Sequence, residues 1–163
     1  MSINLRAGNS VIPGNVYTTS YAWGTDVPTG TAILALENPI SSTKKVGFLA
    51  GGTGGWNIQT TLVEVTFTLR RGVKLSSGTL ITAEKYNSSS PTATVLVHAG
   101  GSWTLGGLIS TYTLILHGGM AYVPITLPTE LELKAGEAII MVLTTESAAS
   151  TIFPNVSYVW YEL

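Results

Sequence analysis

Residues 62–70 read Leu-Val-Glu-Val-Thr-Phe-Thr-Leu-Arg, and this stretch decides the fold class. Apolar and polar side chains alternate strictly, which places Val63 and Val65 on one face and Glu64 and Thr66 on the other. A period of two residues, with one apolar and one polar face, is typical of a half-buried β-strand. The stretch therefore predicts a sheet with one face in a core and the other toward solvent.

Similar runs of β-forming residues occur along most of the chain, and no segment combines a helical apolar stripe with helix caps. Gly, Pro, Asn and Ser separate the runs, as expected for short strands joined by turns. We predict an all-β fold, a single antiparallel jelly-roll β-sandwich or barrel of about eight strands over residues 31–163. The further strands are expected at 31–36, 45–50, 79–83, 93–98, 108–116, 121–127, 138–145 and 156–162.

Residues 1–30 differ in composition and are interpreted as an extended N-terminal arm of the same domain. They hold only two charged residues and show no strong periodicity, apart from one expected strand over 16–23. Disordered segments are poor in aromatic residues, so the aromatic content argues for an arm that docks on its own barrel or on a neighbour. The aromatic residues of the arm are Tyr17, Tyr21 and Trp23.

Charged residues make up 10% of the 163 residues, whereas ordinary domains contain roughly 25%. Hydroxyls, glycines and apolar groups must therefore cover much of the surface, as in a protein whose surface is hidden by partners. A net charge of −1 argues against direct nucleic-acid binding. The lack of cysteine excludes disulfides and thiolate zinc sites. Glycine and proline interrupt every long apolar run, so we expect no transmembrane segment.

Two strands are apolar on both faces: residues 138–143 and the C-terminal strand. Because a sandwich strand needs only one apolar face, something must cover the other. The candidates are another part of the same barrel, the folded-back N-terminal segment, or a second subunit, since Tyr and Trp are enriched at interfaces. The hypothetical subunit interface comprises Tyr17, Tyr21, Trp23, Ile139, Met141, Leu143, Val159, Trp160, Tyr161 and Leu163.

Catalytic chemistry is difficult to build from this chain, and we predict no enzyme activity, cofactor or metal site. The two histidines, His98 and His117, each end an expected strand and are interpreted as structural. Two histidines without a nearby carboxylate make a poor metal site. Glu130, Glu132 and Glu137 flank a turn, where charged residues commonly protect a strand edge from unwanted pairing.

Two other segments resemble binding motifs only superficially. The glycine-rich run 51–56 lacks the Gly-Lys-Ser/Thr ending and the helix of a phosphate-binding loop, so we interpret it as a flexible loop between strands. Arg70 and Arg71 with Lys74 form a basic cluster that is too small for nucleic-acid binding without an aromatic platform.

The order of several turn-and-strand segments resembles that of small jelly-roll bacteriophage virion proteins, the capsid or head-decoration subunits with a tumour-necrosis-factor-like barrel. In them an Asn-Pro, a short polar turn and a basic residue precede a strand, and a Lys-x-Gly turn precedes the last hairpin. The resemblance covers residues 31–163, and its segments are 32–39 (Ala-Ile-Leu-Ala-Leu-Glu-Asn-Pro), 41–46 (Ser-Ser-Thr-Lys-Lys-Val), 65–71 (Val-Thr-Phe-Thr-Leu-Arg-Arg), 75–79 (Leu-Ser-Ser-Gly-Thr), 85–94, 131–138 (Leu-Glu-Leu-Lys-Ala-Gly-Glu-Ala) and 158–162 (Tyr-Val-Trp-Tyr-Glu).

The resemblance implies a structural protein of a virion, assembled in the host cytoplasm. Its partners would be further copies of itself, as a dimer or trimer, and other capsid proteins. The alternative is a carbohydrate- or receptor-binding β-sandwich head, in which Trp56, Trp103 or Tyr112 would stack on sugar rings. The resemblance carries over no catalytic residues.

Overall fold

The computed structural model describes residues 5–7, 10–12, 15–86, 89–126, 131–146 and 152–163. The described residues form strands joined by turns and irregular segments, with no helix among them, so the all-β prediction is confirmed. No helix that is long and apolar enough to span a membrane occurs in those ranges. The strands are β1 (Leu5–Ala7), β2 (Ser10–Ile12), β3 (Asn15–Ala22), β4 (Ala32–Glu37), β5 (Val46–Ser76), β6 (Thr79–Ile81), β7 (Glu84–Lys85), β8 (Leu96–Ala99), β9 (Ser102–Pro124), β10 (Glu132–Leu133), β11 (Ala138–Glu146) and β12 (Ile152–Glu162).

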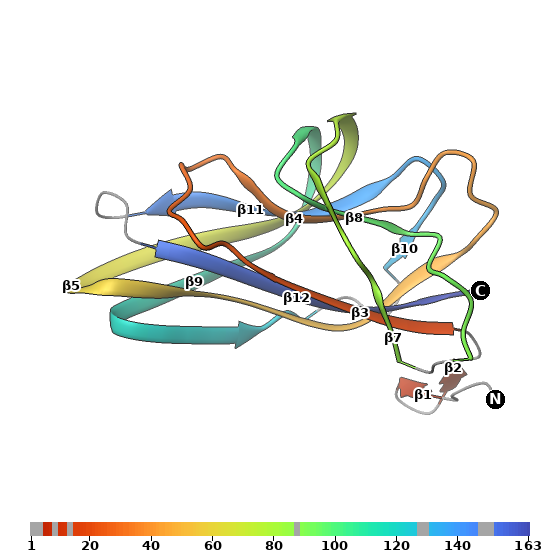
Figure 1. Ribbon diagram of the computed structural model, residues 1–163, viewed down its shortest axis with the longest axis horizontal. Helices are drawn as coiled ribbons and strands as arrows, with labels where there is room; N and C mark the ends of the chain where they lie inside the picture. The colour runs from red at the N-terminus through yellow and green to blue at the C-terminus, as the bar shows by residue number, and fades with distance from the viewer. Residues whose placement is uncertain (1–4, 8–9, 13–14, 87–88, 127–130, 147–151) are drawn as a thin grey trace.

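Ten of these strands belong to one antiparallel sheet that curls into a half-barrel, while β1 and β2 pair only with each other (Figure 1). The order along the sheet is β6-β8-β4-β11-β5-β12-β3-β7, and β9 and β10 also pair with β5. The two longest strands, β5 and β9, are paired over most of their length. The half-barrel is therefore built around one long two-stranded ribbon.

The β5–β9 ribbon turns back on itself and connects two layers. Its register shifts between Asn57 and Leu62, where residues 58–61 of β5 stand opposite Gly118 of β9. Gly118 has a φ of 51°, a left-handed conformation that glycine adopts without a steric penalty. Beyond this bend β5 pairs with β11, whereas before it β5 pairs with β12. We call the layer with β11, β4, β8 and β6 the upper layer, and the layer with β12, β3 and β7 the lower layer (Figure 1).

The apolar core lies between the two layers. From the upper layer Phe67 and Met141 point inward. Phe67 lies on the apolar face predicted from the alternation of residues 62–70. From the lower layer Trp160 and Tyr158 point inward, and the rings of Tyr17 and Trp160 stack with centroids 5.8 Å apart. All five side chains are completely buried, so the core is filled by both layers of a single chain.

The second half of the N-terminal arm joins this sheet. Its strand β3 pairs with β12 from Asn15↔Glu162 to Ala22↔Asn155, which confirms the strand expected at 16–23. Trp23 follows it, and its indole Nε1 donates a hydrogen bond to the carbonyl of Ile33, 3.1 Å away. Residues 15–23 of the arm therefore dock on the protein's own barrel, one of the two arrangements that the aromatic content of the arm indicated.

The glycine-rich run 51–56 is part of strand β5 and is not a flexible loop, so that prediction was wrong. It pairs with β12 on one side and with β9 on the other. Glycine is needed here because aromatic side chains from neighbouring strands lie directly on the backbone. A Cβ at Gly52 would overlap the ring of Tyr122, and one at Gly47 would overlap the ring of Tyr161.

The faces of β11 are also the reverse of the predicted arrangement. Ile139, Met141 and Leu143 point into the core, and the second apolar face consists of Ala138, Ile140 and Val142. Ala32 and Ala35 of the neighbouring strand β4 belong to the same apolar cluster, and Trp103 of β9 packs against it. Alternation indicates that β11 has two apolar faces, but it does not reveal which face the second layer covers.

Tyr158 provides a test of the core. Its hydroxyl is buried without a hydrogen-bond partner among the described residues, and burial raises its pKa well above the usual 10.0, with Tyr112 adding to the shift. Burial and the nearby Glu162 carboxylate also raise the pKa of Tyr17. Since an unfolded tyrosine loses its proton near pH 10 and these folded ones do not, the free energy of unfolding should fall as pH rises above 10.

We expect Tyr158→Phe to leave the free energy of unfolding at pH 8 unchanged or raise it by up to about 1 kcal/mol, because it removes an unsatisfied buried hydroxyl. The variant should also lose less stability than the wild type between pH 9 and pH 11. Urea unfolding followed by tryptophan fluorescence measures both. Tyr122→Phe, which removes an exposed hydroxyl bonded to Ser157, is the control for losing a hydroxyl. A loss above about 2 kcal/mol in Tyr158→Phe would contradict the placement of this side chain.

Candidate functional site

The most distinctive surface of the molecule follows strand β9. Between Ser110 and His117 its side chains alternate strictly: Tyr112 and Leu114 are buried, whereas Thr113 and Ile115 are exposed. No Asp, Glu, Lys or Arg occurs anywhere in residues 86–129. We define the β9 surface as the exposed apolar side chains of this strand, which are Leu105, Leu108, Ile115, Met120 and Tyr122.

Strand β9 also forms a free edge of the sheet. It pairs with β5, and the described part of the chain supplies no strand to its other side. The hydroxyl of Tyr112 reaches across this side and donates to the carbonyl of Thr126 at 3.3 Å. Side chains therefore close the half-barrel next to β9, where backbone pairing is missing among the described residues.

The opposite margin of the sheet is arranged differently. Strands β6 and β7 are three and two residues long, and the chain between them crosses from the upper to the lower layer (Figure 1). This crossing covers the core on that side. Short margins of this kind offer little backbone for pairing with another chain, unlike the 23 residues of β9.

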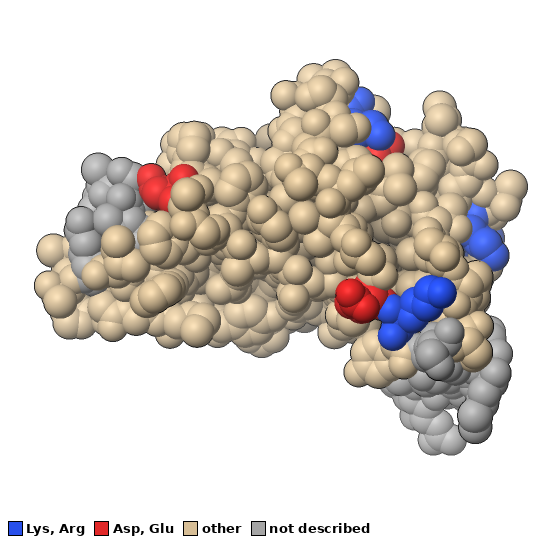
Figure 2. Space-filling view, in the orientation of Figure 1, with Lys and Arg blue, Asp and Glu red and all other residues tan. Residues whose placement is uncertain are grey.

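The outer face of the lower layer is aromatic and nearly uncharged. Tyr161 and Tyr122 lie over glycines of β5, and the Tyr122 hydroxyl hydrogen-bonds the hydroxyl of Ser157. Figure 2 shows charged groups near the ends, at the top and at the lower right of the visible face, while uncharged atoms cover the left and middle of its lower flank. Burying such a surface against a partner would remove few charged groups from water, so its desolvation would cost little.

An apolar cleft of about 330 Å³ lies next to this face, at the end of the molecule where the ribbon bends. The rings of Trp56 and Phe153 meet edge to face with centroids 6.1 Å apart, and Met120 of the β9 surface is 73% exposed beside them. The full lining is Ala22, Trp23, Gly24, Trp56, Met120, Phe153 and Asn155. Asn155 is the one residue of this lining with a polar side chain, so the cleft suits an apolar group.

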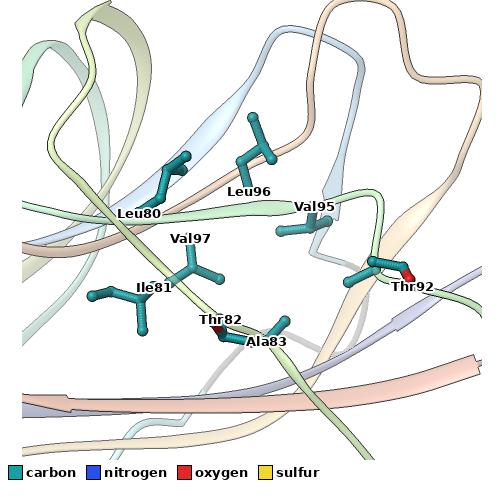
Figure 3. Close-up of a pocket in the computed structure, with 9 residues that line it drawn as sticks. Leu80, Ile81, Thr82, Ala83, Thr92, Val95, Leu96 and Val97 are labelled. Carbon is teal, nitrogen blue, oxygen red and sulfur yellow. The ribbon is translucent and has the colours of Figure 1, made fainter.

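A second depression, of about 230 Å³, lies between β6 with the residues that follow it and β8 with the residues that precede it (Figure 3). Ile81 and Ala83 line one side, and Val95 and Val97 line the other (Figure 3). Threonine hydroxyls are its polar side-chain groups. A lining of this kind contains no acid, base or charged group with which to perform catalysis.

The chain also holds a buried charged cluster that sequence reasoning missed. The Oε2 atom of Glu37 lies 2.6 Å from Nζ of Lys74 and 2.8 Å from Nε2 of His98. The ring of Trp103 meets the His98 ring edge to face, with centroids 5.6 Å apart, and helps to cover it. One signal was present in the sequence: Glu37 is the only charged residue in β4, all six residues of which are buried.

This cluster does not qualify as an active site. His98 is only 1% exposed, so a substrate has no access to its ring. The expectation that the histidines have no neighbouring carboxylate was nevertheless wrong for His98, because β4 and β8 are paired and bring Glu37 beside it. His117 is exposed on β9 and far along the sheet from the cluster. Within the described ranges no group of three or more His, Asp or Glu side chains is placed to hold a metal.

Arg71, Glu137 and Glu162 form structural contacts elsewhere in the fold. Arg71 pairs with Glu137 at 3.0 Å, and Glu132 is exposed, whereas Glu130 lies outside the described residues. The carboxylate of Glu162 accepts hydrogen bonds from the backbone N–H groups of Thr94 and Val95, and from Trp160 Nε1. Glu162 thereby ties the segment before β8 to the last strand.

The predicted interface residues fall into two groups. The first lies in the protomer's own core or packs against it: Tyr17, Tyr21, Trp23, Ile139, Met141, Leu143 and Trp160. The second is on the outside: Val159 and Tyr161 are half-buried, and Leu163 is exposed. Tyr17, Ile139, Met141, Leu143 and Trp160 are fully buried and offer a neighbour no side-chain surface, whereas Tyr21 and Trp23 are half-buried and keep part of theirs. The exposed residues of the β9 surface were not among the predicted ones, although the long uncharged run 86–129 pointed to that part of the chain.

The comparisons with known proteins identify no relative: the chain matches no family model, no curated protein and no solved structure.

The two histidines provide a matched pair for testing the buried cluster. We expect His98→Ala to lower the free energy of unfolding by about 2–4 kcal/mol, because it leaves a cavity and removes a partner of the buried Glu37 carboxylate. His117→Ala, at an exposed position, should change it by less than about 0.5 kcal/mol. Urea denaturation of both variants at pH 7 measures the difference. Equal effects would show that the His98–Glu37 contact contributes nothing to folding.

Proposed function

We propose that this chain is a structural subunit that associates with copies of itself to form part of a larger particle. The observation that carries the proposal is the β9 surface: five large apolar side chains exposed along one uncharged strand. The resemblance in sequence order supports a bacteriophage virion as the particle. The subunit would then be a capsid or capsid-decorating protein, with other capsid proteins as further partners, assembled in the host cytoplasm.

The energetics of such an assembly favour an uncharged subunit. An interface of ~800 Å² per partner that is about half apolar contributes roughly 10 kcal/mol of hydrophobic free energy per side at ~25 cal/mol per Å². The loss of translational and rotational freedom offsets about 4–15 kcal/mol. A shell gains from many such contacts at once, so each can be individually weak. Like charges on neighbouring copies would remove part of this small surplus.

A second candidate is a carbohydrate- or receptor-binding head. Exposed Trp56 at the rim of the apolar cleft favours it, because sugar rings stack on such aromatic faces. The other aromatic residues of this hypothesis are less available: Tyr112 is buried and Trp103 packs on β11. The cleft also offers few polar groups, whereas sugar hydroxyls need several hydrogen-bond partners. Self-association therefore accounts for more of the surface.

The test is the mass of the protein in solution over a concentration series, measured by light scattering behind a sizing column. We expect the wild type to form a discrete dimer or trimer, or to grow into larger species. Ile115→Lys places a charge at a position that is 62% exposed on the β9 surface, and should shift the mass toward the monomer. Ile40→Lys, at a position 87% exposed in the turn after β4, should keep the wild-type mass. A wild type that stays monomeric at high concentration would overturn the proposal.

A further inference from the structure

The free edge of β9 indicates how two copies of the chain could associate, because its unpaired backbone groups can hydrogen-bond a further strand. A strand that is hydrogen-bonded on one side only is a template for a further strand, and proteins normally protect such edges with charges, prolines, bulges or short length. Residues 110–117 carry none of the first three protections. They contain no charge and no proline, and their pairing with β5 runs from Leu69↔Ser110 to Leu62↔His117 without a shift.

The rest of β9 is less suited to pairing. Register shifts interrupt the ribbon between Leu69 and Arg70, between Arg70 and Gly72, and again near Lys74. On the other side of the bend the strand ends at Pro124, which has no N–H to donate. The regular, unprotected part of the edge is therefore residues 110–117, which rise by about 27 Å at ~3.4 Å per residue.

We infer that residues 110–117 of β9 pair antiparallel with the same residues of a second copy, across a two-fold axis, so that the two half-barrels share one continuous sheet. This deepens the proposed function and rests on it, since it names the surface and the partner of the self-association. The pairing would add main-chain hydrogen bonds between the copies. Exposed Ile115, and Leu62 and Leu108 at the two ends, supply apolar contact beside them.

The absence of charge points to a second copy as the occupant. Across a two-fold axis each residue near the axis meets its own equivalent, so any charged side chain there would face a like charge. Directly opposed like charges destabilise a strand pair. Ser, Thr, Ile and Leu avoid this conflict and include β-branched residues that favour extended backbone. A partner of different sequence would impose no such requirement on this edge.

A cysteine scan tests the inference, because the natural chain has no cysteine. The variants are Thr111→Cys, Thr113→Cys, Ile115→Cys and His117→Cys, all at exposed outward positions. Equivalent residues at the axis have Cα atoms about 4.5–5.5 Å apart, within disulfide range. Each two-residue step away from the axis separates the equivalents by about 13–14 Å more, beyond that range.

We expect mild oxidation to give a sharp maximum of covalent dimer at one of the four positions if that residue lies on the axis. If the axis passes through the inward residue between two of them, the maximum should appear when those two variants are mixed, because each then opposes the other across the axis. The yield at the maximum should be at least about tenfold above that of Ile40→Cys, the control at an exposed turn. Thr66→Cys is the second control. Thr66 lies on β5 opposite Thr113, one strand in from the edge, and should not cross-link if the copies pair edge to edge.

Each other outcome contradicts the inference in a distinct way. Similar cross-linking at Thr66→Cys and Thr113→Cys would show that the sheets stack face to face. A wild type that is oligomeric by light scattering, with no maximum of covalent dimer at any β9 position, would show that the copies associate through another surface or another strand edge. Both results would overturn edge pairing and leave the proposed self-association standing. A strictly monomeric wild type would overturn both proposals.

Discussion

The structure depends on one constraint, the bend of the β5–β9 ribbon. If the two strands continued straight past residues 58–61 and Gly118, β11 and β12 would flank distant parts of a single flat sheet. The bend brings the two halves of β5 over each other, so that Phe67 of the upper layer and Trp160 of the lower layer enter one core. Strands β10, β11 and β12 pair directly with a half of this ribbon, and β4, β8, β6, β3 and β7 are added outward from β11 and β12. The bend also leaves β9 at the open side of the half-barrel.

Glycine has a second role in β5 that follows from the same geometry. The first half of the strand lies between β12 and β9, and their tyrosines cover its backbone at Gly47 and Gly52. The rings of Tyr161 and Tyr122 thus shield main chain on the outer face, where charged side chains would otherwise meet solvent. This arrangement places aromatic rings on the outer face of the lower layer.

Sequence periodicity was a good guide to the strands and a poor guide to their surroundings. The alternation at residues 62–70 correctly assigned Phe67 to the core, because only one face there is apolar. In β11 both faces are apolar, so alternation cannot decide between Met141 and Ile140; the answer depends on which layer the ribbon brings over the strand. The contact of Glu37 with His98 depends on the pairing of β4 with β8, which the sequence does not reveal. The glycines at 51–56 were interpreted as a loop because local propensity takes no account of the aromatic rings that cover them in the sheet. The jelly-roll connectivity stays a prediction.

The distribution of charge is the feature of this fold that most supports the proposed self-association. Single carboxylates in the fold have several partners: Glu37 contacts both Lys74 and His98, and Glu162 accepts hydrogen bonds from three N–H groups. Solubility of a lone monomer would favour charges on the longest free strand, since a single lysine there is a simple protection against edge pairing. That strand instead lies wholly within the one long stretch of the chain that has none. An edge that is long, regular and uncharged is a liability for a free monomer and an advantage for a subunit that is buried by its own copies.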